Sequence, residues 1–232
     1  MENKLILITG ASRGIGFETA RCLADSGHNV LATARSQDAL GKLKNHSPGL
    51  IDTVAADLTD PGGIAAIADY LAQRDEALDG LVHNAGLLIN KPFPDLTDDD
   101  WRQMLEVNLL GPVRLTRALI TRLKKESHIV NISSMGGYQE SSKFPGLSGY
   151  STAKGALSIL TECLAVELAD HEISANCLCL GAVQTEMLQE AFPGMEAPVS
   201  SALMGAYISD FVLQAHRFYN GKILPVALSD PE

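Results

Sequence analysis

The chain has 232 residues, of which 46% are hydrophobic and 20% are charged, and its formal net charge is −10. This composition is typical of a globular protein with a buried core and argues against a disordered chain. The excess of acidic residues disfavours duplex nucleic acid or an anionic membrane surface as the main partner, because both attract basic proteins.

Short apolar runs alternate with helical patterns along the whole chain. Strands are predicted over residues 5–9, 29–34, 51–56, 78–83, 128–133, 173–180 and 222–226. Helices are predicted over residues 15–26, 63–74, 98–125, 149–169 and 199–218. Several strands lack strict alternation, as expected where helices cover both faces of a sheet. The chain is therefore predicted to be α/β, a doubly wound parallel sheet of about seven strands in a single domain over residues 1–232.

A glycine-rich turn joins the first predicted strand to the first predicted helix and reads TGASRGIG over residues 9–16. Glycines permit a tight turn and a close approach of the backbone to a phosphate, and a helix N-terminus offers free N–H groups to it. Three glycines alone are a weak signal, because a plain strand–helix turn can hold them. The residues of this turn predicted to bind a dinucleotide are Gly10, Ser12, Arg13, Gly14, Ile15 and Gly16.

Three further motifs follow in chain order: HNAG at 83–86, NISS at 131–134 and YSTAK at 150–154. Together with the glycine turn they resemble the short-chain dehydrogenase/reductase family, over essentially the whole chain. The resemblance implies a Rossmann-like fold, a nicotinamide cofactor and hydride transfer between that cofactor and a carbonyl or alcohol.

The chemistry of the last two motifs can be argued from the residues themselves. Tyr150 and Lys154 are four positions apart and share a helix face. A tyrosine has a pKa of about 10, and a nearby ammonium lowers it, so we expect Lys154 to make Tyr150 a usable acid or base. Ser134 ends a strand and can hydrogen-bond the same substrate oxygen as charge develops there.

The resemblance assigns roles to further positions. Asn108 matches a catalytic residue that holds a water in a proton relay, although a buried amide that closes helix hydrogen bonds would look the same. Lys154 would also bind the nicotinamide ribose together with Tyr150. The remaining positions that match cofactor-binding residues are Asp57, Leu58, Asn84, Ala85, Gly86, Gly181, Val183 and Thr185.

The end of the second predicted strand indicates which nicotinamide cofactor is used. NAD enzymes commonly place an acidic residue there, on the ribose 2′-hydroxyl. Here Ala34 holds that position, and Arg35 follows it. Arg13 in the glycine turn would face the same ribose, and two guanidinium groups suit a 2′-phosphate. We therefore predict NADP as the cofactor, although either arginine alone would more often be a solvated surface residue.

Three departures from the family pattern concern the substrate end. Leu180 replaces a proline, which changes the backbone beside the nicotinamide. The interval between Ser134 and Tyr150 is longer than in many relatives, and its polar residues 139–143 are expected at the pocket mouth. The substrate lid near residues 185–198 is short. Its apolar surface would come from Met187, Leu188, Phe192 and Met195.

Metal sites and exported proteins are not favoured. The acidic run at 98–100 follows Thr97 and is interpreted as a helix cap. Cys22, Cys163, Cys177 and Cys179 have no Cys-x-x-Cys spacing, so we expect core packing and no metal. The N-terminal apolar run is too short for a signal peptide, and no run reaches the ~18 residues of a membrane span, so we expect a cytoplasmic protein.

Four functional hypotheses remain at this point. The leading one is an aldehyde or ketone reductase that uses NADP(H), assembled as a homodimer or homotetramer through the predicted helices 98–125 and 149–169. Their small residues Gly111, Ala118, Gly155, Ala156 and Ala165 would allow close approach. A 3-oxoacyl-acyl carrier protein reductase is an alternative, for which a basic patch could form from Arg114, Arg117, Arg122, Lys124 and Lys125. A dinucleotide sensor without turnover is the third hypothesis, and the four filled catalytic positions count against it. A related enzyme of the same fold, such as an epimerase or dehydratase, is the fourth, and the one-domain length without a large C-terminal insertion counts against it.

Overall fold

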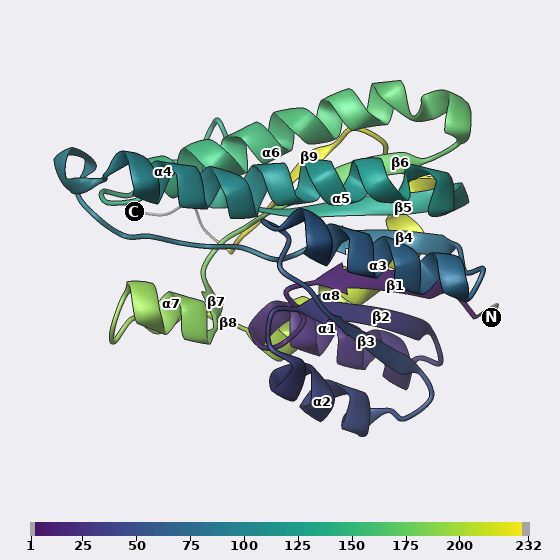
Figure 1. Ribbon diagram of the computed structural model, residues 1–232. Coiled ribbons are helices and arrows are strands. Elements are labelled where there is room, and N and C mark those ends of the chain that lie inside the picture. Colours follow the sequence, from purple (N-terminus) through teal and green to yellow (C-terminus); the bar gives the residue numbers. More distant parts are fainter. Residues whose placement is uncertain (1–2, 229–232) are drawn as a thin grey trace.

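A seven-stranded parallel sheet forms the centre of the protein (Figure 1). The computed structural model describes residues 3–228, so the first two and last four residues of the predicted 1–232 domain lie outside it. The strand order is β3-β2-β1-β4-β5-β6-β9. The strands are β1 (Leu5–Thr9), β2 (Asn29–Ala34), β3 (Ile51–Ala55), β4 (Leu78–His83), β5 (Leu123–Ser134), β6 (Ser174–Leu180) and β9 (Ile223–Val226). The predicted fold class is confirmed, and the order reverses direction between β1 and β4, where such sheets bind ligands.

Helices cover both faces of the sheet. One face carries α1 (Gly14–Asp25), α2 (Gln37–His46) and α8 (Ser201–Gln214), packed on alternate strand residues such as Ile6 and Ile8. The other face carries α3 (Pro61–Gln73), α5 (Gly111–Leu119) and α6 (Ser148–Glu167), packed on residues such as Leu7. Because successive strand residues point to opposite faces, the apolar strands supply two cores at once.

A small lid lies apart from these layers (Figure 1). It consists of β7 (Val183–Gln184), α7 (Glu186–Ala191) and β8 (Val199–Ser200), with β7 and β8 paired in parallel. These elements enclose residues 185–198, where a short substrate lid is predicted from the sequence, and the name lid is used for them below.

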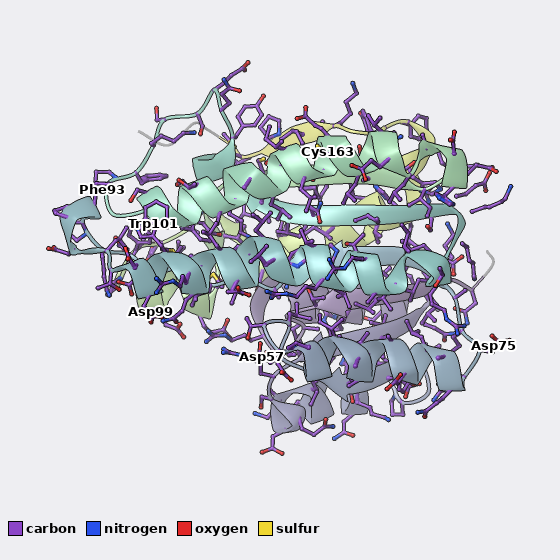
Figure 2. All side chains as sticks on the ribbon, turned by 45° about the horizontal axis from the view of Figure 1, so that its top comes forward. Asp57, Asp75, Phe93, Asp99, Trp101 and Cys163 are labelled. Atoms are coloured by element: carbon purple, nitrogen blue, oxygen red, sulfur yellow. The ribbon has the colours of Figure 1, made fainter. Side chains whose placement is uncertain are left out.

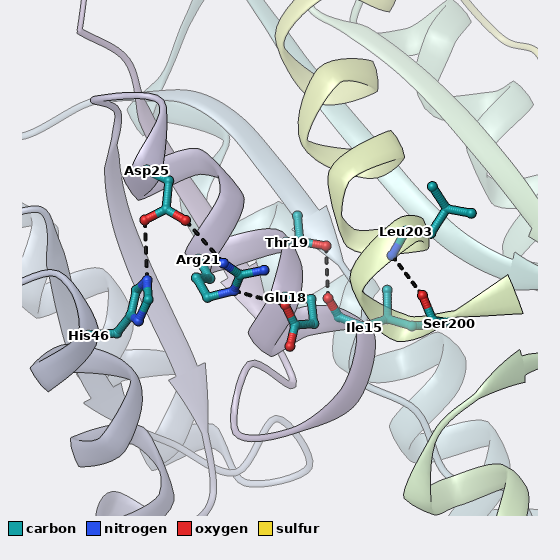
Figure 3. Close-up of polar contacts among 8 residues, drawn as sticks. All are labelled: Ile15, Glu18, Thr19, Arg21, Asp25, His46, Ser200 and Leu203. Atoms are coloured by element: carbon teal, nitrogen blue, oxygen red, sulfur yellow. Dashed lines mark hydrogen bonds and ion pairs between the residues drawn. The ribbon is translucent and has the colours of Figure 1, made fainter.

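Side-chain caps fix where several helices begin, and ion pairs join residues within and between helices. Thr97 and Asp100 cap each other's backbone at the start of α4 (Asp98–Leu105), which confirms the interpretation of the acidic run. Ser200 accepts a hydrogen bond from the N–H of Leu203 at 3.2 Å and starts α8 (Figure 3). In the same view Arg21 lies between Glu18 and Asp25 of α1, while His46 of α2 contacts Asp25 at 3.2 Å.

The predicted helix over 98–125 ends too late, because its last residues belong to a strand. After α4 the chain makes a wide π-helical turn, Glu106–Leu110, before α5, and a short 3₁₀ turn, Ile120–Arg122, ends the helical segment. Residues from Leu123 onward belong to β5, with Leu123 paired to Leu78 ahead of a shift in register. The strand start is fixed by partners distant in sequence, since Lys124 pairs with Asp79 of β4 at 2.9 Å.

Helix α2 was not predicted from the sequence.

The cysteines divide into two groups. Cys177 and Cys179 are buried on β6, as expected. Cys22 is half-buried, and Cys163 is exposed on α6, so the core interpretation is wrong for Cys163 (Figure 2). Within residues 3–228 no three histidine, cysteine, aspartate or glutamate side chains gather as metal ligands. No helix in this range is both long and apolar enough to cross a membrane.

Candidate active site

A cavity of about 1390 Å³ opens at the carboxyl ends of the central strands. It joins the glycine turn after β1 to the first turn of α6, so segments far apart in sequence share one wall. The predicted residues that line it are Gly10, Ser12, Arg13, Gly14, Ile15, Arg35, Asp57, Leu58, Asn84, Ala85, Gly86, Ser134, Tyr150, Lys154, Gly181, Val183 and Thr185. Two predicted site residues, Gly16 and Asn108, do not line the cavity.

The glycine turn is held in shape by its neighbours. Gly10 and Gly14 have φ of 67° and 58°, a backbone region that favours glycine. A Cβ at Gly16 would lie 2.4 Å from Nδ2 of Asn84. Glycine is therefore required at this position by the packing of Asn84, although Gly16 does not line the cavity. Asn84 Nδ2 donates to the carbonyl oxygens of Thr9 and Gly10 at 3.0 and 3.2 Å. The side chain of Asn84 therefore braces the turn.

Thr9 is a positioning residue that sequence reasoning missed. Its Oγ1 accepts hydrogen bonds from the backbone N–H groups of Asn84 and Ala85, both at 3.0 Å. This ties the ends of β1 and β4 together beneath the cavity. A threonine directly before the first glycine was the available signal, but nothing local shows that its hydroxyl faces another strand.

Three of the four predicted catalytic side chains, Ser134, Tyr150 and Lys154, line the far end of the cavity. Ser134 ends β5, and its Oγ accepts a hydrogen bond from the N–H of Gly136 at 3.1 Å. Tyr150 lies in the first turn of α6, and Nζ of Lys154 lies 5.8 Å from the centre of its ring. Nζ also donates to the carbonyl oxygen of Ile132 at 2.8 Å, which fixes the buried lysine toward the sheet.

Two glycines allow α6 to approach the end of β5. A Cβ at Gly137 would lie 2.7 Å from both the backbone N of Gly155 and the carbonyl carbon of Lys154. A Cβ at Gly136 would lie 2.6 Å from Oγ of Ser151. The short turn Met135–Gly137 therefore packs directly on the helix that carries Tyr150 and Lys154, and this contact sets their distance from Ser134.

Burial changes the acidity of both titratable groups. It raises the pKa of Tyr150 to about 12 and lowers the pKa of Lys154 to about 8. The expectation that Lys154 depresses the pKa of Tyr150 is therefore wrong for this structure. Desolvation disfavours the phenolate and the ammonium alike, and it is the main cause of both shifts.

Asn108 lies in the π-helical turn and is fully buried. Its Nδ2 donates to the carbonyl oxygens of Leu87 and Met104, each at 2.8 Å, and its Oδ1 accepts from the N–H of Leu87 at 3.1 Å. The amide thus closes the widened helix and holds the segment after β4. Gly86 lies beside it, because a Cβ there would be 3.2 Å from this Oδ1 and 3.6 Å from Nζ of Lys154.

Charged side chains gather at the opposite end of the cavity. Arg35 follows β2 and is exposed, and its charge contributes to the lowered pKa of Asp57, after the larger effect of the hydrogen bond from the N–H of Thr59. Arg13 forms an ion pair with Glu190 of α7, with 2.6 Å between Nη1 and Oε1. This partner was not predicted, because no local pattern joins the lid to the glycine turn.

The lid closes one side of the cavity. Thr185 caps α7, since its Oγ1 accepts from the N–H of Leu188 at 3.2 Å. The predicted lid residues Met187, Leu188, Phe192 and Met195 all line the cavity. Residues 139–143 do not, contrary to expectation, and the buried Ser141 instead donates to the carbonyl oxygen of Tyr138 at 3.0 Å.

The departure at Leu180 leaves the backbone in the sheet. Leu180 is the last residue of β6 and pairs with Ser134 on one side and Val226 on the other. The N–H of Gly181 donates to the carbonyl oxygen of Val226 at 3.0 Å. The lining of the cavity beside Ser134 is therefore continuous with strand β9.

Comparison with known proteins agrees with this site. The family model described as short chain dehydrogenase matches residues 4–196. The chain is 30% identical over 212 residues to cyclopentanol dehydrogenase from a Comamonas species, covering 88% of this chain and 82% of that protein. It is 30% identical to the 3-oxoacyl-[acyl-carrier-protein] reductase FabG of Escherichia coli, covering 80% and 76%. The protein therefore belongs to the short-chain dehydrogenase/reductase family, whose members are oxidoreductases that act on alcohol or ketone groups with a nicotinamide cofactor.

Other matches differ in length or are structural. The chain is 32% identical to a fatty acyl-CoA reductase of Acinetobacter baylyi, covering 81% of this chain but only 65% of that protein. It is 31% identical to dehydrogenase/reductase SDR family member 7B of Bos taurus and spans 60% of its length. A 3-ketoacyl-(acyl-carrier-protein) reductase from Brucella melitensis, solved in complex with NADH, superposes with a TM-score of 0.88 at 25% identity over 97% of both chains.

Proposed function

We propose that this protein interconverts an apolar aldehyde or ketone and its alcohol, with NADP(H) as the hydride carrier. The main support is that a single cavity is lined by both groups of residues. Ser134, Tyr150 and Lys154 lie at one end, and the guanidinium groups of Arg13 and Arg35 lie at the other. The glycine turn between them opens α1, so its N–H groups suit a pyrophosphate. These residues fit a dinucleotide that reaches from the arginines to Tyr150.

The catalytic roles follow from the chemistry of the side chains. The bound nicotinamide supplies or accepts the hydride. Tyr150 donates its phenolic proton to the carbonyl oxygen in reduction and accepts it from the alcohol in oxidation. Ser134 donates a hydrogen bond to the same oxygen as negative charge develops there. Lys154 binds the nicotinamide ribose through its ammonium group.

Asn108 acts through its neighbours in this proposal. Its side-chain hydrogen bonds to Leu87 and Met104 hold the π-helical turn. The family resemblance adds a water at this turn, which would return protons to Lys154. Asn84 and Thr9 likewise shape the cofactor end by bracing the glycine turn.

The cofactor assignment depends on two guanidinium groups and a missing acid. Ala34 occupies the end of β2, where a carboxylate would otherwise repel a 2′-phosphate, and Arg35 follows it. We expect NADPH to bind more tightly than NADH in direct titrations of the purified protein. Arg35→Ala should weaken NADPH binding at least tenfold and NADH binding less than twofold, as for loss of a charge-assisted phosphate contact. Tighter binding of NADH than of NADPH by the unmodified protein would refute the assignment.

Apolar side chains around Tyr150 support a substrate without charged groups. The lining of the cavity that contains Tyr150 is rich in methionine, leucine and phenylalanine: Leu87, Met135, Phe144, Leu147, Met187, Leu188, Phe192 and Met195. Such a surface favours a hydrocarbon group over a carboxylate or phosphate. Turnover of cyclic and linear apolar ketones, compared with that of short keto acids, tests this directly.

The reduction of 3-oxoacyl groups on a carrier protein is the second candidate, because two similar proteins carry that name. An acidic carrier protein needs net positive charge on its partner, and carboxylates beside the basic groups cancel that charge. Four of the five basic side chains considered for this role already pair with carboxylates: Arg114 with Glu106, Arg122 with Asp75, Lys124 with Asp79 and Lys125 with Glu172. We therefore favour a free small-molecule carbonyl, and assays with a 3-oxoacyl thioester distinguish the two. Absence of turnover on every carbonyl, with NADPH still bound, would favour a dinucleotide sensor.

A further inference from the structure

The lid helix is tied to the glycine turn by one ion pair. Both terminal nitrogens of Arg13 contact the carboxylate of Glu190, with Nη1 2.6 Å from Oε1 and Nη2 3.3 Å from Oε2. Arg13 is the residue before α1, and Glu190 lies near the end of α7, 177 positions later in the chain. This fork is the geometry in which a guanidinium also binds a phosphate.

Two further contacts place α7 across the mouth of the cavity. Its first turn lies against the glycine turn, because a Cβ at Gly14 would be 3.4 Å from Cγ2 of Thr185 and 3.6 Å from Oε2 of Glu186. Its far end is held by Asn90, whose Nδ2 donates to the carbonyl oxygen of Ala191 at 3.0 Å. The helix therefore spans from the segment after β4 to the start of α1, and Glu190 provides its charged link on the α1 side.

The carboxylates of α7 face the side chain to which the proposed function assigns the 2′-phosphate. The hydrogen bond to Glu190 is the main cause that raises the pKa of Arg13, with smaller contributions from the negative charges of Glu190 and Glu186, and the same hydrogen bond lowers the pKa of Glu190. Both partners of the pair are about half exposed, with side-chain exposures of 50% and 62%. An exposed ion pair is weak, so a dianionic phosphate at the same guanidinium can displace it.

We propose that Glu190 is a specificity-determining residue for the cofactor, which competes with the 2′-phosphate for Arg13 and is released, with its lid helix, when the phosphate binds. This inference rests on the proposed use of NADP(H). A cofactor without the 2′-phosphate leaves Arg13 paired with Glu190. The pair thus lowers the affinity for NADPH and couples the lid to the phosphate.

The test compares cofactor binding by Glu190→Gln and the unmodified protein, followed by the fluorescence of NADPH and NADH. The glutamine keeps the size of the side chain but removes its charge. We expect the Kd of NADPH to fall about three- to tenfold, because the variant loses one exposed ion pair and the repulsion between the Glu190 carboxylate and the phosphate. The Kd of NADH should change less than twofold. The effect on NADPH should shrink in high salt, because the groups are exposed.

Two controls separate this competition from general effects of charge or folding. Glu186→Gln removes the same charge from the same helix without breaking a hydrogen bond to Arg13, and should change the Kd of NADPH less than Glu190→Gln does. In an Arg13→Ala background, Glu190→Gln should have less than a twofold effect on NADPH, since the shared partner is gone.

Hydrogen exchange provides a readout of the lid that does not depend on turnover. Adenosine 2′,5′-bisphosphate should increase amide exchange over residues 186–191, whereas adenosine 5′-monophosphate should not. In Glu190→Gln the exchange should be fast with either nucleotide.

The outcomes distinguish this inference from the proposed function. If the unmodified protein binds NADH more tightly than NADPH, both are overturned. If it prefers NADPH but Glu190→Gln leaves the Kd of NADPH unchanged or raises it, the competition is overturned and the cofactor assignment stands. A tightening of equal size for NADH and NADPH also overturns it, because the phosphate would then play no part.

Discussion

At the scale of single residues, burial affects the two titratable groups of the catalytic end in opposite directions. The raised pKa of Tyr150 keeps its phenol protonated, ready to donate to a carbonyl. The lowered pKa of Lys154, about 8, puts the loss of its charge close to physiological pH. Neither value could be read from the spacing of the two residues, because desolvation depends on everything that packs around them.

Replacement of Tyr150 by phenylalanine tests the proton transfer. The ring and its packing remain, while the proton donor is lost. Turnover should fall by the ~10²–10⁴-fold typical of a positioned acid or base, with the Kd of NADPH kept within about twofold. Steady-state kinetics on a good ketone and a cofactor titration measure the two quantities. Near-normal turnover by Tyr150→Phe would assign the proton to another group.

The pH dependence of carbonyl reduction should report Lys154. Reduction needs the protonated phenol, available below a pKa of about 12, and the ammonium, available below about 8. The kcat/KM for a ketone should therefore be level at lower pH and fall about tenfold per unit once the pH exceeds 8. A profile that stays level to pH 9.5 would contradict a role for the ammonium in the free enzyme.

At the scale of elements, the approach of α6 to the end of β5 is what assembles the catalytic group. Gly137→Ala tests it, because the added Cβ meets the backbone at Gly155 and Lys154 at 2.7 Å and neither backbone atom can turn aside. Overpacking of this kind costs about 1–3 kcal/mol of stability, and a shift of the helix by about 1 Å costs about 10²-fold in turnover. Thermal unfolding and kinetics on the same samples measure both.

Gly41→Ala is the matched control for this substitution. Gly41 lies in α2, away from the cavity, and no atom lies within 4 Å of its added Cβ. An alanine there should stabilise the protein by about 0.5–1 kcal/mol and leave turnover unchanged. Equal losses of turnover in the two variants would show that the effect at Gly137 is not local to α6.

At the scale of the whole molecule, the outer surface of α6 carries apolar side chains that a monomer would leave in water. Ile159 and Val166 are 60% and 78% exposed, and Cys163 lies between them. Two of the small residues that suggested a subunit interface, Gly111 and Gly155, instead make contacts inside the chain. Gly111 packs on Leu58, and Gly155 packs on Gly137, both within the chain.

We therefore expect a homodimer or homotetramer whose interface includes the outer face of α6. The double variant Ile159→Glu and Val166→Glu should reduce the molar mass measured by light scattering at micromolar concentration. Glu162→Gln on the same helix, which places no charge at an apolar position, should not. If the unmodified protein is already monomeric in this measurement, the predicted assembly is wrong.

The sequence by itself determined the fold class, the seven strands of the central sheet apart from the start of β5, and most of the site residues that line the cavity. Each of these depends on a local pattern: apolar runs form strands, a glycine turn follows β1, and motifs end at the carboxyl edge of a parallel sheet. The boundaries of β1, β2 and β4 agree with prediction to the residue. Local patterns suffice here because the edge at which parallel strands end is common to all of them.

Only the tertiary structure decided where distant segments touch. The helix predicted over 98–125 continues into β5 because Lys124 and Leu123 find partners at the start of β4. Asn84 and Asn108 use their amides to hold backbone, and Arg13 meets a carboxylate of the lid. Hydrogen bonds, ion pairs and desolvation act between groups brought together by folding, so no spacing along the chain could reveal them.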